Sequence, residues 1–210
     1  MIKQKLGDRI DGWIHTVFPF LFTRPLNPNS LTVVGAVGSL VAAVAFAFGW
    51  FATGGILMLA SGFFDLVDGV VARHHGVSTR FGQFLDSTLD RFADMVVLVG
   101  IATHFAVVGE PGLVLLTGSA LLAGVLVSYA AACAKLAVPS ISNLGFLERG
   151  ERVGILAAGT ILGFSVIALW ILLLGSLLTV GQRFAQAYRE MESLDAIDRS
   201  RLADPLGTGG

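Results

Sequence analysis

Charged residues are scarce in this sequence: they make up 14% of its 210 residues, against roughly 25% in a typical soluble domain. The chain has one cysteine, Cys133, so an internal disulfide is excluded, and no Cys or His at ligand spacing predicts a zinc site around it. It has no basic block, which argues against a nucleic-acid partner, because phosphate binding needs clustered Lys and Arg. These absences exclude a water-soluble globule, a disulfide scaffold and a nucleic-acid-binding protein.

The chain is rich in apolar residues, which make up 54% of it. Several apolar runs approach the roughly 20 residues that cross the hydrocarbon core of a bilayer. This composition predicts an all-α polytopic membrane protein, in which one helical bundle takes up most of the length. The predicted spans cover residues 31–50, 56–72, 82–108 and 113–138, and a longer apolar run covers residues 153–180.

The positions of the basic residues divide the last apolar run into two helices. All 14 Lys and Arg fall in the N-terminal segment, around 73–91, at 135–152 or from 183 onward. Cytoplasmic loops are rich in Lys and Arg, so both ends of this run are predicted to be cytoplasmic. The run then crosses twice, with a turn near 163–165, and six transmembrane helices result. A Gly54-Gly55 turn is expected before the second span.

Residues 1–24 have apolar side chains at helical spacing and polar ones elsewhere on the wheel, which predicts an amphipathic helix in the membrane interface. They contain no compact apolar core before a cleavage site, so a cleavable signal is not expected. Residues 25–188 are predicted to form the six-helix domain, in the cell (inner) membrane. Residues 189–210, with many polar residues and few large apolar ones, are predicted to be a disordered cytoplasmic tail.

Acidic residues inside the second and third predicted spans are the informative anomaly. Each charge within a bilayer costs at least roughly 2.5 to 3.5 kcal/mol on insertion scales, so these carboxylates need partners. Helical spacing puts the acids of each span on one face, and the two faces can meet across a cleft. Mg²⁺ or Mn²⁺ suits an all-carboxylate site, and a metal pair is a common device for phosphoryl displacement. The acids are Asp65, Asp68, Asp86, Asp90 and Asp94.

Other interpretations of these acids are open. They could form buried salt bridges with Arg73, Arg80 and Arg91, although three arginines cannot neutralise five acids. They could instead line the passage of a divalent-cation transporter, which has no need of the glycine and arginine residues spaced around them. A catalytically silent scaffold would keep costly charges in the bilayer without using them.

The acids belong to the longer pattern Asp65-x2-Asp68-Gly69-x2-Ala72-Arg73-x8-Gly82-x3-Asp86-x3-Asp90. This pattern resembles, without a departure, the signature of the CDP-alcohol phosphotransferase family. The resemblance implies a membrane enzyme that transfers a substituted phosphate from a CDP-linked lipid, such as CDP-diacylglycerol, to a small polar alcohol and releases CMP. It also implies a homodimer with its active site facing the cytoplasm. In addition, Pro28-Asn29-Ser30-Leu31-Thr32 is similar to the opening of the family's first span.

The resemblance also implies roles for individual residues. Asp65, Asp68 and Asp86 would hold two divalent ions, Mg²⁺ or Mn²⁺. Asp90 would contribute to that metal site and act as the general base, because an alcohol is a poor nucleophile until a carboxylate takes its proton. Some of the residues implied around the CDP-lipid, at 29 and 32, could equally cap a helix. The implied CDP-lipid residues are Asn29, Thr32, Gly69, Ala72, Arg73, Thr79 and Gly82.

Two segments resemble the branch of the family that uses inositol phosphate. Asp86-Ser87-x2-Asp90-Arg91-x2-Asp94 is similar to its third span, and Glu148-Arg149-Gly150-Glu151-Arg152 resembles its Glu-Arg-x-Glu-Arg, whose arginines grip the acceptor's phosphate. Ala131 and Cys133 stand where that branch has Lys and Arg. Either Lys135 compensates or the acceptor is another small alcohol, with glycerol phosphate, serine and inositol as alternatives. The implied acceptor-binding residues are Lys135, Arg149 and Arg152, although the arginines also fit a plain cytoplasmic loop.

Overall fold

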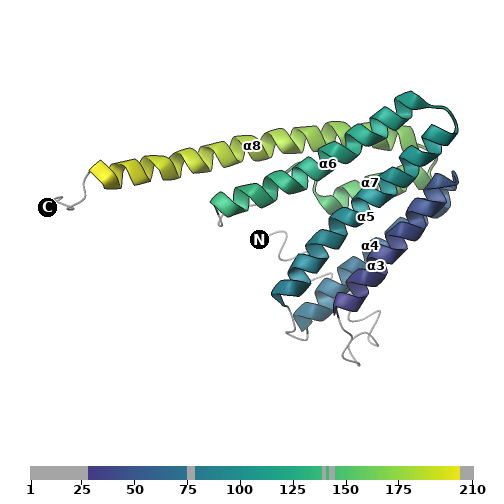
Figure 1. Ribbon diagram of the computed structural model, residues 1–210, viewed down its shortest axis with the longest axis horizontal. Helices are drawn as coiled ribbons and strands as arrows, with labels where there is room; N and C mark the ends of the chain where they lie inside the picture. The colour runs from purple at the N-terminus through teal and green to yellow at the C-terminus, as the bar shows by residue number, and fades with distance from the viewer. Residues whose placement is uncertain (1–27, 75–78, 139–140, 142–144, 204–210) are drawn as a thin grey trace.

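The computed structural model describes residues 28–74, 79–138, 141 and 145–203, and within them the chain forms six helices and no strand (Figure 1). This confirms the all-helical class. The helices are α3 (Pro28–Ala47), α4 (Phe51–His74), α5 (Arg80–Val107), α6 (Pro111–Ala137), α7 (Arg149–Ile161) and α8 (Ser165–Ala203). The predicted interfacial helix of residues 1–24 lies outside the described residues.

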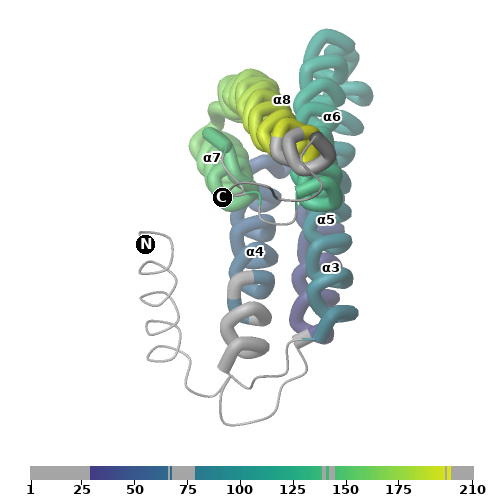
Figure 2. Tube along the Cα trace, turned by 90° about the vertical axis from the view of Figure 1, so that its left-hand side faces the viewer, coloured from purple at the N-terminus to yellow at the C-terminus, as the bar shows by residue number. Residues whose placement is uncertain are grey.

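The helices form two groups that diverge from one end of the molecule (Figure 1). α3 packs against α4 and α5, and α6 packs against α8, while α5 joins the groups through α6. α7 packs against both α4 and α8, as the view at right angles also shows (Figure 2). The end of α4 and the start of α5 therefore lie toward the open side of the molecule.

Tight turns connect the helices at the end of the molecule from which the two groups diverge. Each of these turns contains a glycine with positive φ: Gly49 (79°), Gly109 (78°) and Gly163 (81°). Glycine adopts this backbone conformation without the steric cost that a Cβ would bring. The turn predicted inside the last apolar run is present, between the end of α7 and the start of α8.

The turn expected at Gly54-Gly55 is wrong, because both residues lie inside α4. A Cβ at Gly54 would lie 2.7 Å from the Phe46 ring, and one at Gly55 would lie 2.5 Å from Thr160 Oγ1. These glycines let α4 approach its neighbours closely, which is the usual use of small residues in membrane helices.

Three helical stretches are long and apolar enough to cross a membrane: Asn29–Ala47, Pro111–Ala137 and Ser165–Ala196. α4 has a shorter apolar stretch, Phe51–Asp65, and the 13 residues of α7 span about 20 Å at 1.5 Å per residue. The described residues thus show a helical protein with three candidate spans, and six spans stay a prediction.

The tail predicted to be disordered is helical through Ala203, as the end of α8. Extending an existing helix avoids the cost of nucleation. Local hydrogen bonds support this extension: Gln186 Nε2 donates to Glu190 Oε1 at 3.1 Å, and Arg199 Nε donates to the carbonyl of Asp195 at 3.1 Å. Residues 204–210 lie outside the described residues.

The apolar core occupies one half of α5 and leaves the other half for polar groups. Phe46, Ile101 and Leu169, from α3, α5 and α8, are fully buried in this core. The buried residues of α5 begin at Ala93; its earlier turns carry Asp86 and Asp90, and Asp94 directly follows Ala93. The start of α5 is therefore the place where a site can form.

Candidate functional site

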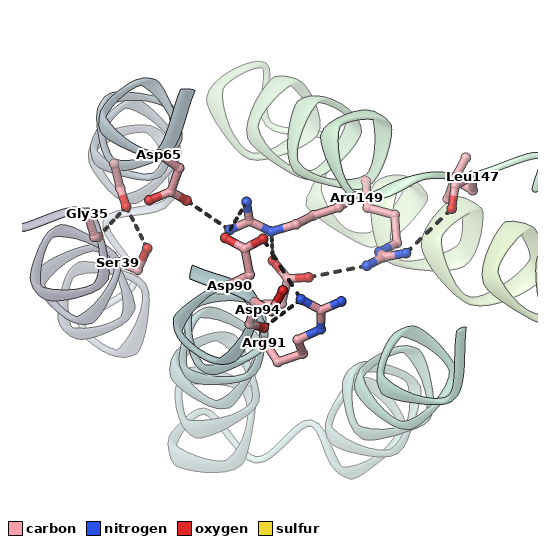
Figure 3. A network of polar contacts seen from close by, with 11 residues as sticks. Gly35, Ser39, Asp65, Asp90, Arg91, Asp94, Leu147 and Arg149 are labelled. Atoms are coloured by element: carbon pink, nitrogen blue, oxygen red, sulfur yellow. Dashed lines mark hydrogen bonds and ion pairs between the residues drawn. The ribbon is translucent and has the colours of Figure 1, made fainter. Parts of the chain in front are cut away.

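Asp65 on α4 and Asp90 on α5 contact the same guanidinium group, that of Arg149 on α7 (Figure 3). Arg149 Nη2 donates to Asp65 Oδ2 at 2.9 Å, and Arg149 Nη1 lies 2.9 Å from Asp90 Oδ1. The acids of the two helices thus face one place, as their spacing predicts. The sequence did not reveal that Arg149 is their counter-ion.

Asp94, one turn after Asp90 on α5, bridges two arginines of α7. Asp94 Oδ1 lies 3.4 Å from Arg149 Nε, and Asp94 Oδ2 lies 3.3 Å from Arg152 Nη2. The Arg152 side chain is 8% exposed and also donates to the carbonyl of Leu147 at 3.4 Å. A guanidinium buried to this extent needs a paired charge, which Asp94 supplies.

The start of α7 is held by local hydrogen bonds and by α8. The backbone N–H of Glu148 donates to Glu151 Oε2 at 2.7 Å, as part of a capping box. The preceding residue, Leu147, donates its N–H to Thr179 Oγ1 on α8 at 3.0 Å. Arg149 and Arg152 are three positions apart, so both side chains leave the same side of this anchored helix.

Asp86 belongs to the same cluster of charged side chains. Its carboxylate interacts electrostatically with the carboxylate of Asp65 and with the guanidinium groups of Arg149 and Arg91. Arg91 lies 3.9 Å from Asp90 Oδ2, so it is a weaker partner than Arg149. The other arginine on α5 that the salt-bridge interpretation invoked, Arg80, is exposed. The Asp68 side chain lies outside the described part of the structure. Among the side chains that are described, no three His, Cys, Asp or Glu are grouped closely enough to hold a metal ion.

Three of the residues implied around the CDP-lipid come together where α3 and α5 begin. A Cβ at Gly82 would lie 3.0 Å from Asn29 Oδ1 and 3.1 Å from Thr79 Oγ1. Thr79 is the N-cap of α5, and its hydroxyl accepts the N–H of Gly82 at 2.9 Å. Thr32 is buried on α3. Gly69, Ala72 and Arg73 lie on α4, and their side chains are outside the described part.

Lys135 lies exposed in the last turn of α6, and none of the contacts described for Arg149 and Arg152 involves it. Arg183 on α8 lies near Arg152, and the sequence did not predict this proximity. Its Nη1 donates to the carbonyl of Val127 at 2.7 Å, and it interacts electrostatically with Arg152 and Arg91. The signal available in the sequence was the position of this arginine just after the apolar run of residues 153–180.

A cavity lies beside Asp94 and Arg152. Side chains from five helices line it, and most of this lining is apolar. The polar end carries Arg91, Asp94, Arg152 and Ser128, and the apolar walls include Met58, Leu98, Leu121, Val125 and Leu156.

Residues 26–185 match the family model described as CDP-alcohol phosphatidyltransferase. The chain belongs to this family. The predicted resemblance is thereby confirmed, and so is the prediction that the protein is an enzyme. Family membership also removes the support for a cation transporter.

The alignments with relatives in this family cover most of this chain and most of each relative. It is 37% identical over 191 residues to a phosphatidylinositol phosphate synthase of Streptomyces avermitilis, covering 84% of this chain and 78% of that protein. It is 33% identical over 189 residues to an archaetidylinositol phosphate synthase of Pyrococcus horikoshii, covering 90% of this chain and 98% of that protein.

Crystal structures of the Mycobacterium tuberculosis phosphatidylinositol phosphate synthase have the same fold. The structure with CDP-DAG bound has a TM-score of 0.71 at 27% identity, covering 88% of this chain and 94% of that one. The structure in complex with manganese and citrate has a TM-score of 0.72 at 27% identity, covering 87% and 88%.

Proposed function

We propose that this enzyme transfers the phosphatidyl group of CDP-diacylglycerol, or its ether-lipid counterpart, to inositol phosphate and releases CMP. The observation that carries the proposal is a chain of ion pairs. Arg149 contacts Asp90, and Arg149 and Arg152 both contact Asp94. A phosphate-binding pair of arginines thus adjoins the carboxylate expected to act as general base. The names of the relatives support inositol phosphate as the acceptor.

The arginines would bind the phosphate of the acceptor. A guanidinium presents five N–H donors in a planar fork that matches phosphate oxygens. Arg149 is 29% exposed, and Arg152 lies at the polar end of the cavity. A phosphorylated alcohol held there would place its hydroxyl toward Asp90. Lys135 is proposed as a further contact of the same phosphate, reached from the end of α6.

The acids suit two divalent cations, for which the family relationship and the manganese complex of the mycobacterial enzyme are further support. Asp65, Asp86 and Asp90 together carry more negative charge than Arg149 and Arg91 compensate. Asp90 Oδ1 is buried, and the contact described for it is the ion pair with Arg149 Nη1 at 2.9 Å. Asp65, Asp68, Asp86 and Asp90 would hold Mg²⁺ or Mn²⁺, and these ions would neutralise the diphosphate and the CMP leaving group.

Asp90 would then act as the base in the transfer. It takes the proton of the acceptor hydroxyl as that oxygen attacks the phosphorus on the lipid side of the diphosphate. A new phosphorus–oxygen bond forms, and the bond between that phosphorus and the CMP oxygen breaks. The proximity of Asp90 to Arg149 supports this role, because an arginine that binds the acceptor's phosphate also brings its hydroxyl near the base.

The CDP group is proposed to lie where α3, α4 and α5 begin or end. The absence of a side chain at Gly82 leaves Asn29 Oδ1 and Thr79 Oγ1 approachable. Thr32, Gly69, Ala72 and Arg73 would complete this pocket, with Arg73 as the partner of the diphosphate.

The placement in the membrane is part of the proposal. All six helices would cross the cell (inner) membrane, with the charged segments on the cytoplasmic side and residues 1–24 lying in the interface. A homodimer is proposed from the family resemblance. The remainder of the predicted tail, residues 204–210, would stay cytoplasmic.

An acceptor panel tests the proposed reaction. The purified protein is incubated with Mn²⁺, with CDP-diacylglycerol or its archaeol analogue, and with inositol phosphate, inositol, glycerol phosphate or serine. CMP release and the mass of the product lipid are measured. We expect CMP release with inositol phosphate and its loss after chelation of the metal. Turnover with another acceptor and none with inositol phosphate would contradict the proposed acceptor.

A further inference from the structure

We propose that Asp94 is a positioning residue that orients Arg149 and Arg152 to receive the acceptor's phosphate. This inference rests on the proposed function, and it assigns a role to a carboxylate that lies outside the family signature. Asp94 would act through the two arginines, without contacting the CDP-lipid or the metal ions.

The first support is the way the two oxygens of Asp94 are used. Oδ1 forms an ion pair with Arg149 Nε at 3.4 Å, and Oδ2 accepts a hydrogen bond from Arg152 Nη2 at 3.3 Å, so each oxygen faces a different guanidinium (Figure 3). Asp65 and Asp90, in contrast, each place one oxygen 2.9 Å from Arg149. Asp94 is thereby the residue that couples the two arginines to each other.

The second support is burial. The Arg152 side chain is 8% exposed, and its other contact is the carbonyl of Leu147 at 3.4 Å. Arg183 adds positive charge near Arg152, and Arg183 in turn interacts with Arg91 and with the acidic Glu148. Without Asp94, Arg152 would be buried beside like charges, which is a costly state that a side chain relieves by moving. The position of Arg152 therefore depends on Asp94.

The third support is the location of the pair at the cavity. Asp94 and Arg152 both line its polar end, where an anionic group of the acceptor would enter. Arg152 uses Nη2 toward Asp94 and Nη1 toward Leu147. A guanidinium has five N–H donors, so others remain for a phosphate. We expect Asp94 to fix the guanidinium so that its remaining donors serve the cavity that Arg152 lines, as orienting partners do for metal-binding histidines.

The variant Asp94→Asn tests the inference, because it removes the charge and keeps the shape. We expect the KM for inositol phosphate to rise about tenfold, the effect typical of losing an orienting partner. The KM for CDP-diacylglycerol and the Mn²⁺ affinity, measured by electron paramagnetic resonance titration, should stay within about twofold. Asp94→Glu should recover part of the loss. The matched control is Asp198→Asn, an exposed acid on α8.

A double-mutant cycle shows whether Asp94 acts through Arg152. Arg152→Gln combined with Asp94→Asn should raise the acceptor KM by clearly less than the product of the two single effects, because without Arg152 only Arg149 is left for Asp94 to orient. Independent, multiplying effects would overturn the inference. So would a loss of Mn²⁺ affinity in Asp94→Asn that equals its loss of acceptor affinity. If Asp94→Asn does not fold, Asp94→Glu and the doubly neutral variant carry the same comparison, since removing both buried charges is better tolerated than removing one.

The acceptor panel and the Asp94 variants distinguish an error in the proposed function from an error in this inference. If the wild-type enzyme uses another alcohol from the panel, inositol phosphate is wrong, and the cycle is measured with that alcohol. A raised KM for it in Asp94→Asn would support the positioning role. An unchanged KM would overturn it.

Discussion

The acidic side of the site, formed by Asp65, Asp86 and Asp90, differs from its basic side, formed by Arg149, Arg152 and Arg183, in the part of the chain that supplies it. The acids come from α4 and α5, which follow each other in sequence. The arginines come from α7 and α8, and 84 positions separate Asp65 from Arg149. Regions of opposite charge thus meet through tertiary packing, and one can hold cations while the other holds a phosphate.

The two sides also differ in how their charges are compensated. On the basic side, the Arg152 side chain is 8% exposed and depends on Asp94. On the acidic side, Arg149 is shared between Asp65 and Asp90, and Asp86 adds a further negative charge. Changes on the acidic side should therefore alter kcat and metal affinity, whereas changes on the basic side should alter the acceptor KM.

Replacement of Asp90 should have the largest effect. Asp90→Asn keeps the shape but removes the proposed base, and general-base catalysis contributes about 10² to 10⁴-fold. We expect kcat for CMP release to fall by about 10³-fold or more, because a proposed metal ligand is lost together with the base. CMP release is measured at saturating CDP-diacylglycerol and acceptor. Undiminished turnover would contradict the assignment of Asp90, and Asp198→Asn, on the exposed part of α8, serves as control.

Gly35 offers a way to disturb the acidic side without removing a charge. A Cβ at this position on α3 would overlap Asp65 Oδ1. Gly35→Ala should displace the Asp65 carboxylate and weaken Mn²⁺ binding by about tenfold, with a smaller change in the acceptor KM, because Arg149 also contacts Asp65. Mn²⁺ titration followed by electron paramagnetic resonance measures the affinity. The control is Gly118→Ala, where a Cβ meets nothing within 4 Å. Equal Mn²⁺ affinity in both variants would mean that Asp65 is not a ligand.

Much of the bundle could be predicted from the sequence, because apolar runs and the distribution of basic residues both report on helices in a membrane. The turn between α7 and α8 follows from the need to return Arg183 to the side of Arg152. The Gly54-Gly55 turn failed as a prediction, because glycine serves both turns and close helix contacts. The sequence does not distinguish these uses, and here the contact with Phe46 decides.

The candidate site was predictable on one side only. The spacing of Asp86, Asp90 and Asp94 places them on one helical face whatever surrounds it. The partner of that face depends on how α7 packs against α4, which no local pattern encodes. Arg149 was therefore expected to bind the acceptor, and its ion pairs with Asp65 and Asp90 were not anticipated.

Glu151 allows the smallest and most selective change on the basic side. Its Oε2 accepts the N–H of Glu148 at 2.7 Å in the capping box that starts α7. Glu151→Ala should cost about 1 kcal/mol of stability, or about 2 to 4 °C in Tm for a chain of this size. Fraying of this turn loosens Arg149 and Arg152, so the acceptor KM should rise about two- to threefold with kcat and Mn²⁺ affinity unchanged. Glu192→Ala, at an exposed position on α8, is the control. A loss of Mn²⁺ affinity in Glu151→Ala would show that Arg149 also holds the acids in place, so that the two sides of the site form one unit.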